Sequence, residues 1–252
     1  MADKKQTLIG HLGELRRRLI LILAVNLMAA ALCFYRVDLL MDYLLRLAGG
    51  IKLIYISPAE LFLVTIKLAL TAGIVLCLPL TLYQLWAYVA KGLYKNEKLV
   101  TAVTLGVGGL FFAAGVMFAY GVVLPVTLGF FQEIQVSPVT AMVSIQEFVS
   151  FAGALLVAFG IVFEMPVVAA LLAQLGVLKA KTLAKHRGPL ILIIFVIAAA
   201  ITPPDVVSQL LMGIPMAALL ELSIGVCWLI EKSKQRRLKK AQQPEPSQAS
   251  VA

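Results

Sequence analysis

Long apolar runs dominate the chain, and short polar segments separate them. A transmembrane helix needs about 20 consecutive apolar residues. The runs extend approximately over residues 19–35, 62–86, 99–131, 148–175, 189–201 and 206–230. This pattern predicts an all-α polytopic membrane protein with six transmembrane helices, of which the fifth and sixth are short. A hydrophobic fraction of 61% with only 14% charged residues excludes an ordinary water-soluble domain.

The fifth apolar run, residues 189–201, is unusually short. It corresponds to about 20 Å of helix, whereas the hydrocarbon core is about 30 Å thick. Either the bilayer thins beside it, or the fifth and sixth segments form a re-entrant hairpin. Both arrangements leave the C-terminal tail on the same side of the membrane.

The distribution of Lys and Arg predicts the orientation of the chain. Eighteen of these residues lie in residues 1–18, 87–98, 176–188 and 231–252, and three lie in the alternate polar segments. The positive-inside rule therefore places both termini in the cytoplasm. We expect residues 1–230 to form one membrane domain, and residues 231–252 to form a basic and then disordered tail. The net charge of +9 is a topology signal and does not predict nucleic-acid binding.

Polar segments next to the runs carry helix signals. Residues 7–19 and 37–47 have the spacing of amphipathic helices. Ser57, Pro58 and Glu60 match an N-terminal cap with a reciprocal glutamate. Ser144 and Glu147 repeat this spacing. A third variant, at 202–205, includes Pro203 and Asp205.

One carboxylate lies deep within an apolar run, in the stretch FGIVFEMP at 159–166. A charged residue in hydrocarbon costs about 2.5–3.5 kcal/mol, so Glu164 is expected to hold its proton and to have a function. Pro166 cannot donate to the carbonyl of Val162, which predicts a kink and a polar notch. In one interpretation, the notch binds a polar group of a partner helix or of an inserted peptide. In the other, Glu164 only forms a hydrogen bond with a neighbouring span of the same chain. Glu221 lies at a similar predicted depth.

Carboxylates are scarce on the predicted cytoplasmic face, which makes Glu14 and Glu97 candidate binding groups for a cationic partner. Tyr88 and Tyr94 lie close to Glu97 in the sequence, and an arginine can bond a carboxylate and stack on an aromatic ring. In the alternative interpretation, Glu14 pairs with Arg17 or Arg18, and Glu97 caps the third span.

Catalytic patterns are missing from the sequence. It has no HExxH, GxSxG or Walker motif, and the three cysteines lack metal-ligand spacing. The two histidines, His11 and His186, lie at the predicted cytoplasmic edge. The sequence therefore predicts neither an enzyme nor a bound metal or cofactor.

Several motifs occur together in a fixed order. They are HLGELR at 11–16, SPAELF at 57–62, YQLW at 83–86, GLYKNE at 92–97, FEMP at 163–166 and TPPD at 202–205, with Phe118, Tyr120, Pro125, Ser208, Gln209, Pro215 and Glu221. Over residues 8–230 the chain resembles the TatC family, the multi-span core subunit of the twin-arginine protein translocase. The family usually has proline where Lys91 stands and phenylalanine where Tyr88 stands.

This resemblance implies a receptor for the paired arginines in signal peptides of folded proteins. Such a receptor assembles with single-span TatA/TatB-type subunits and with further copies of itself, and the proton gradient drives transport. The resemblance assigns peptide binding to His11, Glu14, Arg16, Tyr88, Tyr94 and Glu97. It implies partner or peptide contacts within the membrane for Glu164, Gln209 and Glu221. Two other interpretations stay open: a small proton-coupled transporter that uses Glu164, and an insertase or scaffold without receptor activity.

Overall fold

The computed structural model describes residues 8–49, 51–93, 98–133, 142–174, 176–202 and 206–241, with side chains at 13–49, 51–84, 106–133, 142–174, 176–202 and 206–236. The helices and strands in chain order are α1 (Leu8–Tyr35), α2 (Val37–Leu47), β1 (Lys52–Ile54), α3 (Pro58–Leu93), α4 (Lys98–Phe118), the π-helix η1 (Ala119–Val123), α5 (Leu124–Glu133), β2 (Met142–Ser144), α6 (Ile145–Phe163), α7 (Met165–Gln174), α8 (Ala180–Lys185), α9 (Arg187–Ile201) and α10 (Val206–Ala241).

The helices confirm the predicted fold class of a polytopic all-α membrane protein. Within the described residues, five stretches are long and apolar enough to cross a membrane, and α9, with 15 residues, is a shorter apolar helix. The five stretches are Gly13–Tyr35, Pro58–Gln84, Gly106–Glu133, Ile145–Gln174 and Val206–Arg236. The amphipathic segment predicted at residues 7–19 forms the first turns of α1 and is continuous with the first span.

The sixth span differs from the prediction of a short helix. α10 has 36 residues, because the helix continues beyond the apolar run through the basic segment up to Ala241. The predicted tail is therefore helical in its first part, and residues 242–252 lie outside the described residues.

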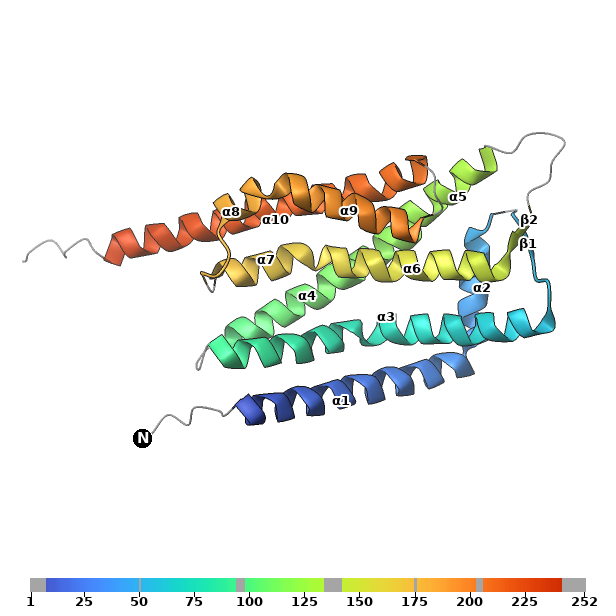
Figure 1. Cartoon of the computed structure of the whole chain (residues 1–252), viewed down its shortest axis with the longest axis horizontal. Coiled ribbons are helices and arrows are strands. Elements are labelled where there is room, and N and C mark those ends of the chain that lie inside the picture. Colours follow the sequence, from blue (N-terminus) through green and yellow to red (C-terminus); the bar gives the residue numbers. More distant parts are fainter. Residues whose placement is uncertain are drawn as a thin grey trace, which may run out of the picture.

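The long helices lie roughly along one axis of the molecule (Figure 1). The first turns of α1 and the last turns of α10 lie at one end, here called the terminal end. The two strands lie at the opposite end, here called the strand end. α3 packs between α1 and α6, and α10 packs against α7 and α9. α2 lies across the strand end, as its predicted amphipathic character requires, and buries Leu44.

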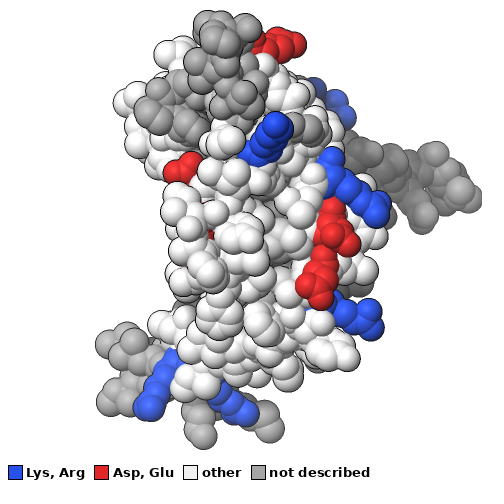
Figure 2. All heavy atoms as spheres, turned by 90° about the vertical axis from the view of Figure 1, so that its right-hand side faces the viewer, with Lys and Arg blue, Asp and Glu red and all other residues white. Residues whose placement is uncertain are grey.

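The surface of the strand end carries a cluster of charged side chains on one side (Figure 2). Figure 2 shows acidic side chains there, flanked by basic ones, whereas most of the rest of the visible surface is uncharged. The exposed charges of α2 are Asp38, Asp42 and Arg46, and the exposed Arg36 directly precedes the helix.

A parallel pair of short strands connects the two polar segments at the strand end. β1 pairs with β2 so that Lys52 lies opposite Met142 and Ile54 lies opposite Ser144. β2 leads directly into α6, and only three residues separate β1 from α3, so the pairing holds the starts of both helices close to each other.

The caps of α3 and α6 share one carboxylate. As predicted, the Glu60 N–H donates to Ser57 Oγ (3.2 Å), and the Glu60 carboxylate accepts from the N–H of Ile56 (2.7 Å). Ser144 caps α6 by accepting from the N–H of Gln146 (3.1 Å), and its hydroxyl donates to Glu60. The acid at the α6 cap is therefore Glu60, and not the predicted Glu147 three residues further on.

The third predicted cap lies at the junction of α9 and α10. The Thr202 hydroxyl donates to the carbonyl of Ala198 (2.9 Å) and so closes the end of α9. Pro203 and Asp205, which the sequence predicts to cap the sixth span, lie outside the described residues.

Glycines allow neighbouring helices to approach until backbone meets backbone. A Cβ atom on Gly73 would lie 2.7 Å from the backbone nitrogen of Ala30, where α3 meets α1. A Cβ atom on Gly115 would lie 2.6 Å from the carbonyl oxygen of Phe159, where α4 crosses α6. Small residues at such crossings are typical of membrane helices, where dispersion contacts replace the hydrophobic effect as the driving force.

The third span changes its helical pitch before a proline. η1 is a single π-helical segment that ends two residues before Pro125, a residue without an N–H donor. It leaves Tyr120 oriented so that its hydroxyl donates to the carbonyl of Tyr43 in α2 (3.0 Å). The irregular segment therefore links the third span to the helix that covers the strand end.

Replacement of Gly115 by alanine should destabilise the fold, because the added methyl group meets the backbone of α6. We expect a loss of about 1–3 kcal/mol, the usual range for overpacking. Gly106→Ala in the same helix is the matched control, because nothing lies within 4 Å of the added atom. Thermal unfolding of both variants in detergent measures the difference, and equal melting temperatures would contradict the close crossing.

Replacement of Glu60 by alanine should lower the melting temperature more than replacement of Glu147, although each lies in the first turn of its helix. Glu60→Ala removes the acceptor for Ile56 and Ser144, and so loosens both helix starts. An equal or smaller effect of Glu60→Ala in thermal unfolding would show that the shared cap does not stabilise this end.

Candidate functional site

A hollow with charged side chains in its wall lies between α1 and α3 near the terminal end (Figure 1). Its volume is about 770 Å³. Gly13, Glu14, Arg17, Arg18, Leu21 and Gln84 are among the residues that line it. This hollow therefore contains Glu14, the candidate binding group on α1, together with a residue of α3.

The carboxylate of Glu14 binds a guanidinium group within the chain. Nη2 and Nε of Arg18 donate to Glu14 Oε1 at 2.8 and 3.0 Å. Nη1 of Arg18 donates to the backbone carbonyl oxygen of Gln84 (2.9 Å) and to its side-chain Oε1 (3.0 Å). Both charged side chains are largely shielded, with 21% of Glu14 and 14% of Arg18 exposed. Arg18 thus fixes the carboxylate in place and joins α1 to α3.

The pairing of Glu14 with Arg18 is the alternative that the sequence left open, and it is present. The sequence did not reveal the bond to Gln84, because this residue lies 66 positions from Arg18. Gln84 occurs in a family motif, but nothing in the local spacing predicts its partner.

The other residues predicted for peptide binding are only partly described. The Arg16 side chain is exposed on α1 and is not among the residues that line the hollow, although its neighbour Arg17 is. His11 in α1 and Tyr88 in α3 have described backbones only, and Tyr94 and Glu97 lie outside the described residues. The end of α3 and the start of α4 both lie at the terminal end (Figure 1), and residues 94–97 connect them.

Glu164 lies at a break in the fourth span, as the sequence predicts. α6 ends at Phe163 and α7 begins at Met165, and the Glu164 N–H donates to the carbonyls of Ile161 and Val162. Pro166 has no N–H to donate to the carbonyl of Val162, so this carbonyl accepts from the N–H of Glu164 instead.

The Glu164 side chain points into the bundle and is only 3% exposed. A Cβ atom on Gly108 of α4 would lie 3.1 Å from its Oε2 atom. Its Oε1 atom has no hydrogen-bond partner among the residues that the structure describes. Lys67 donates to Ser150 (2.6 Å) rather than to this carboxyl group. Glu164 is therefore a buried polar group packed against the backbone of α4.

Gln209 and Glu221 both contact α9. Gln209 Nε2 donates to the carbonyl of Phe195 (3.0 Å). Glu221 Oε1 lies 3.5 Å from Nη1 of Arg187, the first residue of α9, and both side chains are at least half exposed. These contacts hold α9 against the first part of α10. The sequence did not predict the arginine partner of Glu221.

Comparison with known proteins is consistent with these features. The family model described as Sec-independent protein translocase protein (TatC) matches residues 10–215. The chain is 36% identical over 234 residues to TatC of Carboxydothermus hydrogenoformans, with 92% of this chain and 96% of that protein covered. It is 37% identical over 237 residues to TatCd of Bacillus subtilis, with coverage of 93% and 97%.

A solved structure has the same fold. The crystal structure described as the twin arginine translocase receptor TatC matches with a TM-score of 0.80 and 37% sequence identity, and the match covers 88% of this chain and 99% of that chain. Family model, relatives and structure agree over nearly the full described length. The chain therefore belongs to the TatC family of Sec-independent protein translocase proteins.

Proposed function

We propose that this chain is the receptor subunit that binds twin-arginine signal peptides at its terminal end. The observation that carries the proposal is the Glu14 carboxylate on the wall of a hollow, already holding a guanidinium group in two charge-assisted bonds. The structural relative is described as a twin arginine translocase receptor, which supports the same role here.

The hollow suits an arginine of a peptide better than a lysine. The planar guanidinium fork of arginine bonds a carboxylate with two parallel N–H groups, whereas the ammonium of lysine is a point charge. An incoming arginine would share or replace the contact of Arg18 with Glu14. The loop that contains Tyr94 and Glu97 follows the end of α3 at Leu93, at the same end of the molecule as the hollow (Figure 1), so we propose that Glu97 binds the second arginine.

We further propose that the terminal end faces the cytoplasm of a cell with a plasma (inner) membrane. The strong excess of Lys and Arg in the segments at this end supports the orientation, because cytoplasmic segments retain such residues. This places the hollow on the side where folded cargo proteins are made.

Assembly with single-span TatA/TatB-type subunits and with further copies of the chain completes the proposed function. α9 offers exposed apolar side chains outside the pockets, which include Leu192, Ile193 and Val196, and its 15 residues are short for a bilayer. Hydrophobic mismatch favours helix association at such a place. We therefore propose α9 and the adjoining part of α10 as the contact for partner helices.

Charge reversal at the hollow tests the receptor role. Glu14→Arg and Glu97→Arg should each reduce binding of a twin-arginine peptide by at least about tenfold, because repulsion replaces a charge-assisted bond. Glu133→Arg is the matched control, since this exposed glutamate lies at the strand end. Binding is measured on membranes with equal amounts of protein. Unchanged affinity in both variants would refute the assignment.

We also propose that Glu164 makes a polar contact with a partner helix or with the inserted peptide after α4 moves away from it. The unpaired Oε1 atom and the position of the carboxyl group against Gly108 of α4 support this role. A buried polar group without a partner is costly, so a contact that supplies one is favourable.

Two substitutions at Glu164 distinguish a polar contact from simple packing. Glu164→Gln keeps the size and hydrogen-bonding capacity and should retain partial export. Glu164→Leu should bind signal peptide at the terminal end but fail in partner assembly or transport. Export assays and crosslinking to partner subunits provide the two readouts, and normal values of both for Glu164→Leu would rule out the contact.

A further inference from the structure

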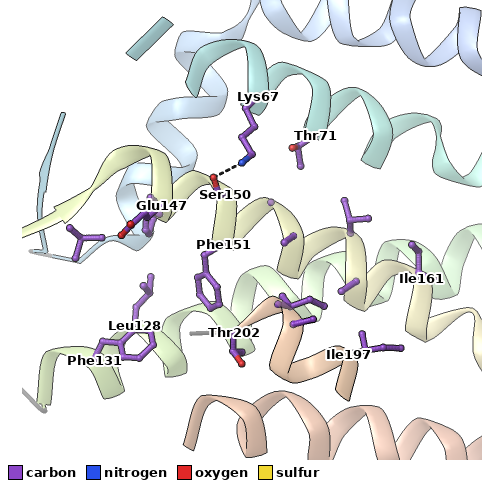
Figure 3. A pocket seen from close by; sticks show the side chains of 18 of the residues that line it. Lys67, Thr71, Leu128, Phe131, Glu147, Ser150, Phe151, Ile161, Ile197 and Thr202 are labelled. Atoms are coloured by element: carbon purple, nitrogen blue, oxygen red, sulfur yellow. Dashed lines mark hydrogen bonds between the residues drawn. The ribbon is translucent and has the colours of Figure 1, made fainter. Parts of the chain in front are cut away.

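A second, larger depression lies on the face formed by α3, α5, α6 and α9 (Figure 3). We call it the lateral groove, and its volume is about 1230 Å³. Its walls are mostly apolar, with Phe151, Val157, Ile161 and Ile197 among the lining residues. Ile161 and Ile197 are about half exposed, so the groove is open to its surroundings. Hydrocarbon is the surrounding medium of these spans.

One cation lies in the wall of the lateral groove. Nζ of Lys67 on α3 donates to Oγ of Ser150 on α6 (2.6 Å; Figure 3). An ammonium group has three N–H donors, so two remain for an acceptor in the groove. Among the described residues, no carboxylate forms an ion pair with Lys67. A charge in a membrane span is costly, and an anionic group beside it would offset that cost.

A carboxylate follows on the side toward the strand end. Glu147 precedes Ser150 by three positions on α6, a spacing that places both on one side of a helix, and it also lines the lateral groove. Figure 3 shows Glu147 near the start of α6, then Lys67 and Ser150, and then the apolar walls with Ile161 and Ile197. From the strand end inward, the groove thus presents a negative group, a positive group with a hydroxyl, and an apolar surface.

We propose that the lateral groove binds one phospholipid with an amine-bearing headgroup, of the phosphatidylethanolamine type. The phosphate accepts hydrogen bonds from Lys67 and Ser150, the ammonium group donates to Glu147, and the acyl chains lie against Ile161 and Ile197. The order of charges in this lipid, with the ammonium group outermost and the phosphate next, matches the order in the groove.

The position of Lys67 along α3 agrees with a headgroup contact. Lys67 follows Pro58, the first residue of α3, by nine positions, or about 13 Å of helix. Its four-carbon stem allows the ammonium group to reach from this depth toward the headgroup region. An apolar partner helix would explain the walls of the groove but not two opposite charges at its head. The proposal is independent of the signal-peptide site, which lies at the other end of the molecule.

Lipid titration by native mass spectrometry tests the proposal. The full-length protein, delipidated in mild detergent, receives phosphatidylethanolamine or phosphatidylglycerol with identical acyl chains. Wild type should bind phosphatidylethanolamine preferentially. Lys67→Gln should weaken binding of both lipids roughly tenfold, the usual size of a lost charge-assisted hydrogen bond. Glu147→Gln should remove only the preference for phosphatidylethanolamine.

Matched variants control for charge and folding. Lys52→Gln and Glu133→Gln remove exposed charges outside the lateral groove and should bind lipid like wild type. Lys67→Arg keeps a cationic donor and should retain most binding, which separates a lost contact from a misfolded protein. Wild-type binding of both lipids by Lys67→Gln and Glu147→Gln would overturn the proposal.

Crosslinking in native membranes distinguishes a lipid from a protein in the lateral groove. A photoreactive residue at Ala154, which is exposed and lines the groove, should yield an adduct with the mass of a phospholipid. Exclusive crosslinking to a single-span protein would overturn the lipid assignment in favour of a helix.

Discussion

The need to satisfy polar groups without water governs this structure. Within hydrocarbon, an unpaired backbone or side-chain polar group costs several kcal/mol, so the chain forms helices and joins their polar side chains in pairs. Asn26 of α1 donates to Thr81 of α3 (3.2 Å), and Gln209 of α10 donates to a carbonyl of α9. Such bonds connect helices that have no hydrophobic driving force for association in lipid.

Close approach of the helices makes these bonds possible. Gly73 and Gly115 let backbones meet, and the resulting short distances bring small polar side chains on neighbouring helices within bonding range. At the strand end, where α3 and α6 begin, Glu60 satisfies donors from both helix starts. At the terminal end, Arg18 performs the corresponding task between α1 and α3. The same groups that hold the helices together therefore also shape the two ends.

Three ionisable side chains lie at the proposed contacts. The Glu14 carboxylate holds an arginine in an accessible hollow, Glu164 is buried with an unpaired oxygen, and Lys67 lies in an open groove. Glu14 lies near the terminal end and Lys67 near the strand end, so the proposed peptide and lipid contacts are well separated along the molecule (Figure 1). Membership of the TatC family fits a receptor with several contacts better than a small transporter with one carrier residue.

Sequence patterns predicted the features that depend on near neighbours. The apolar runs predicted the spans, and the Ser57–Glu60 spacing predicted the cap of α3. Pro166 after Glu164 predicted the helix break between α6 and α7. The same patterns did not predict contacts between positions that are far apart in the sequence. The bond of Ser144 to Glu60 spans 84 positions, and the ion pair of Glu221 with Arg187 depends on the alignment of α9 with α10. Packing against other helices decides such contacts, and no local spacing encodes it.

The proposed receptor distinguishes paired arginines from paired lysines by the geometry of a carboxylate site at its terminal end. Photocrosslinking of the membrane-embedded, full-length protein to two signal peptides, identical except for Arg-Arg or Lys-Lys, tests this discrimination. We expect strong crosslinking of the Arg-Arg peptide to the region around Glu14 and the loop after α3, and much weaker crosslinking of the Lys-Lys peptide, because lysine cannot form the bidentate bond. Equal crosslinking of the two peptides, or crosslinking confined to the strand end, would contradict it.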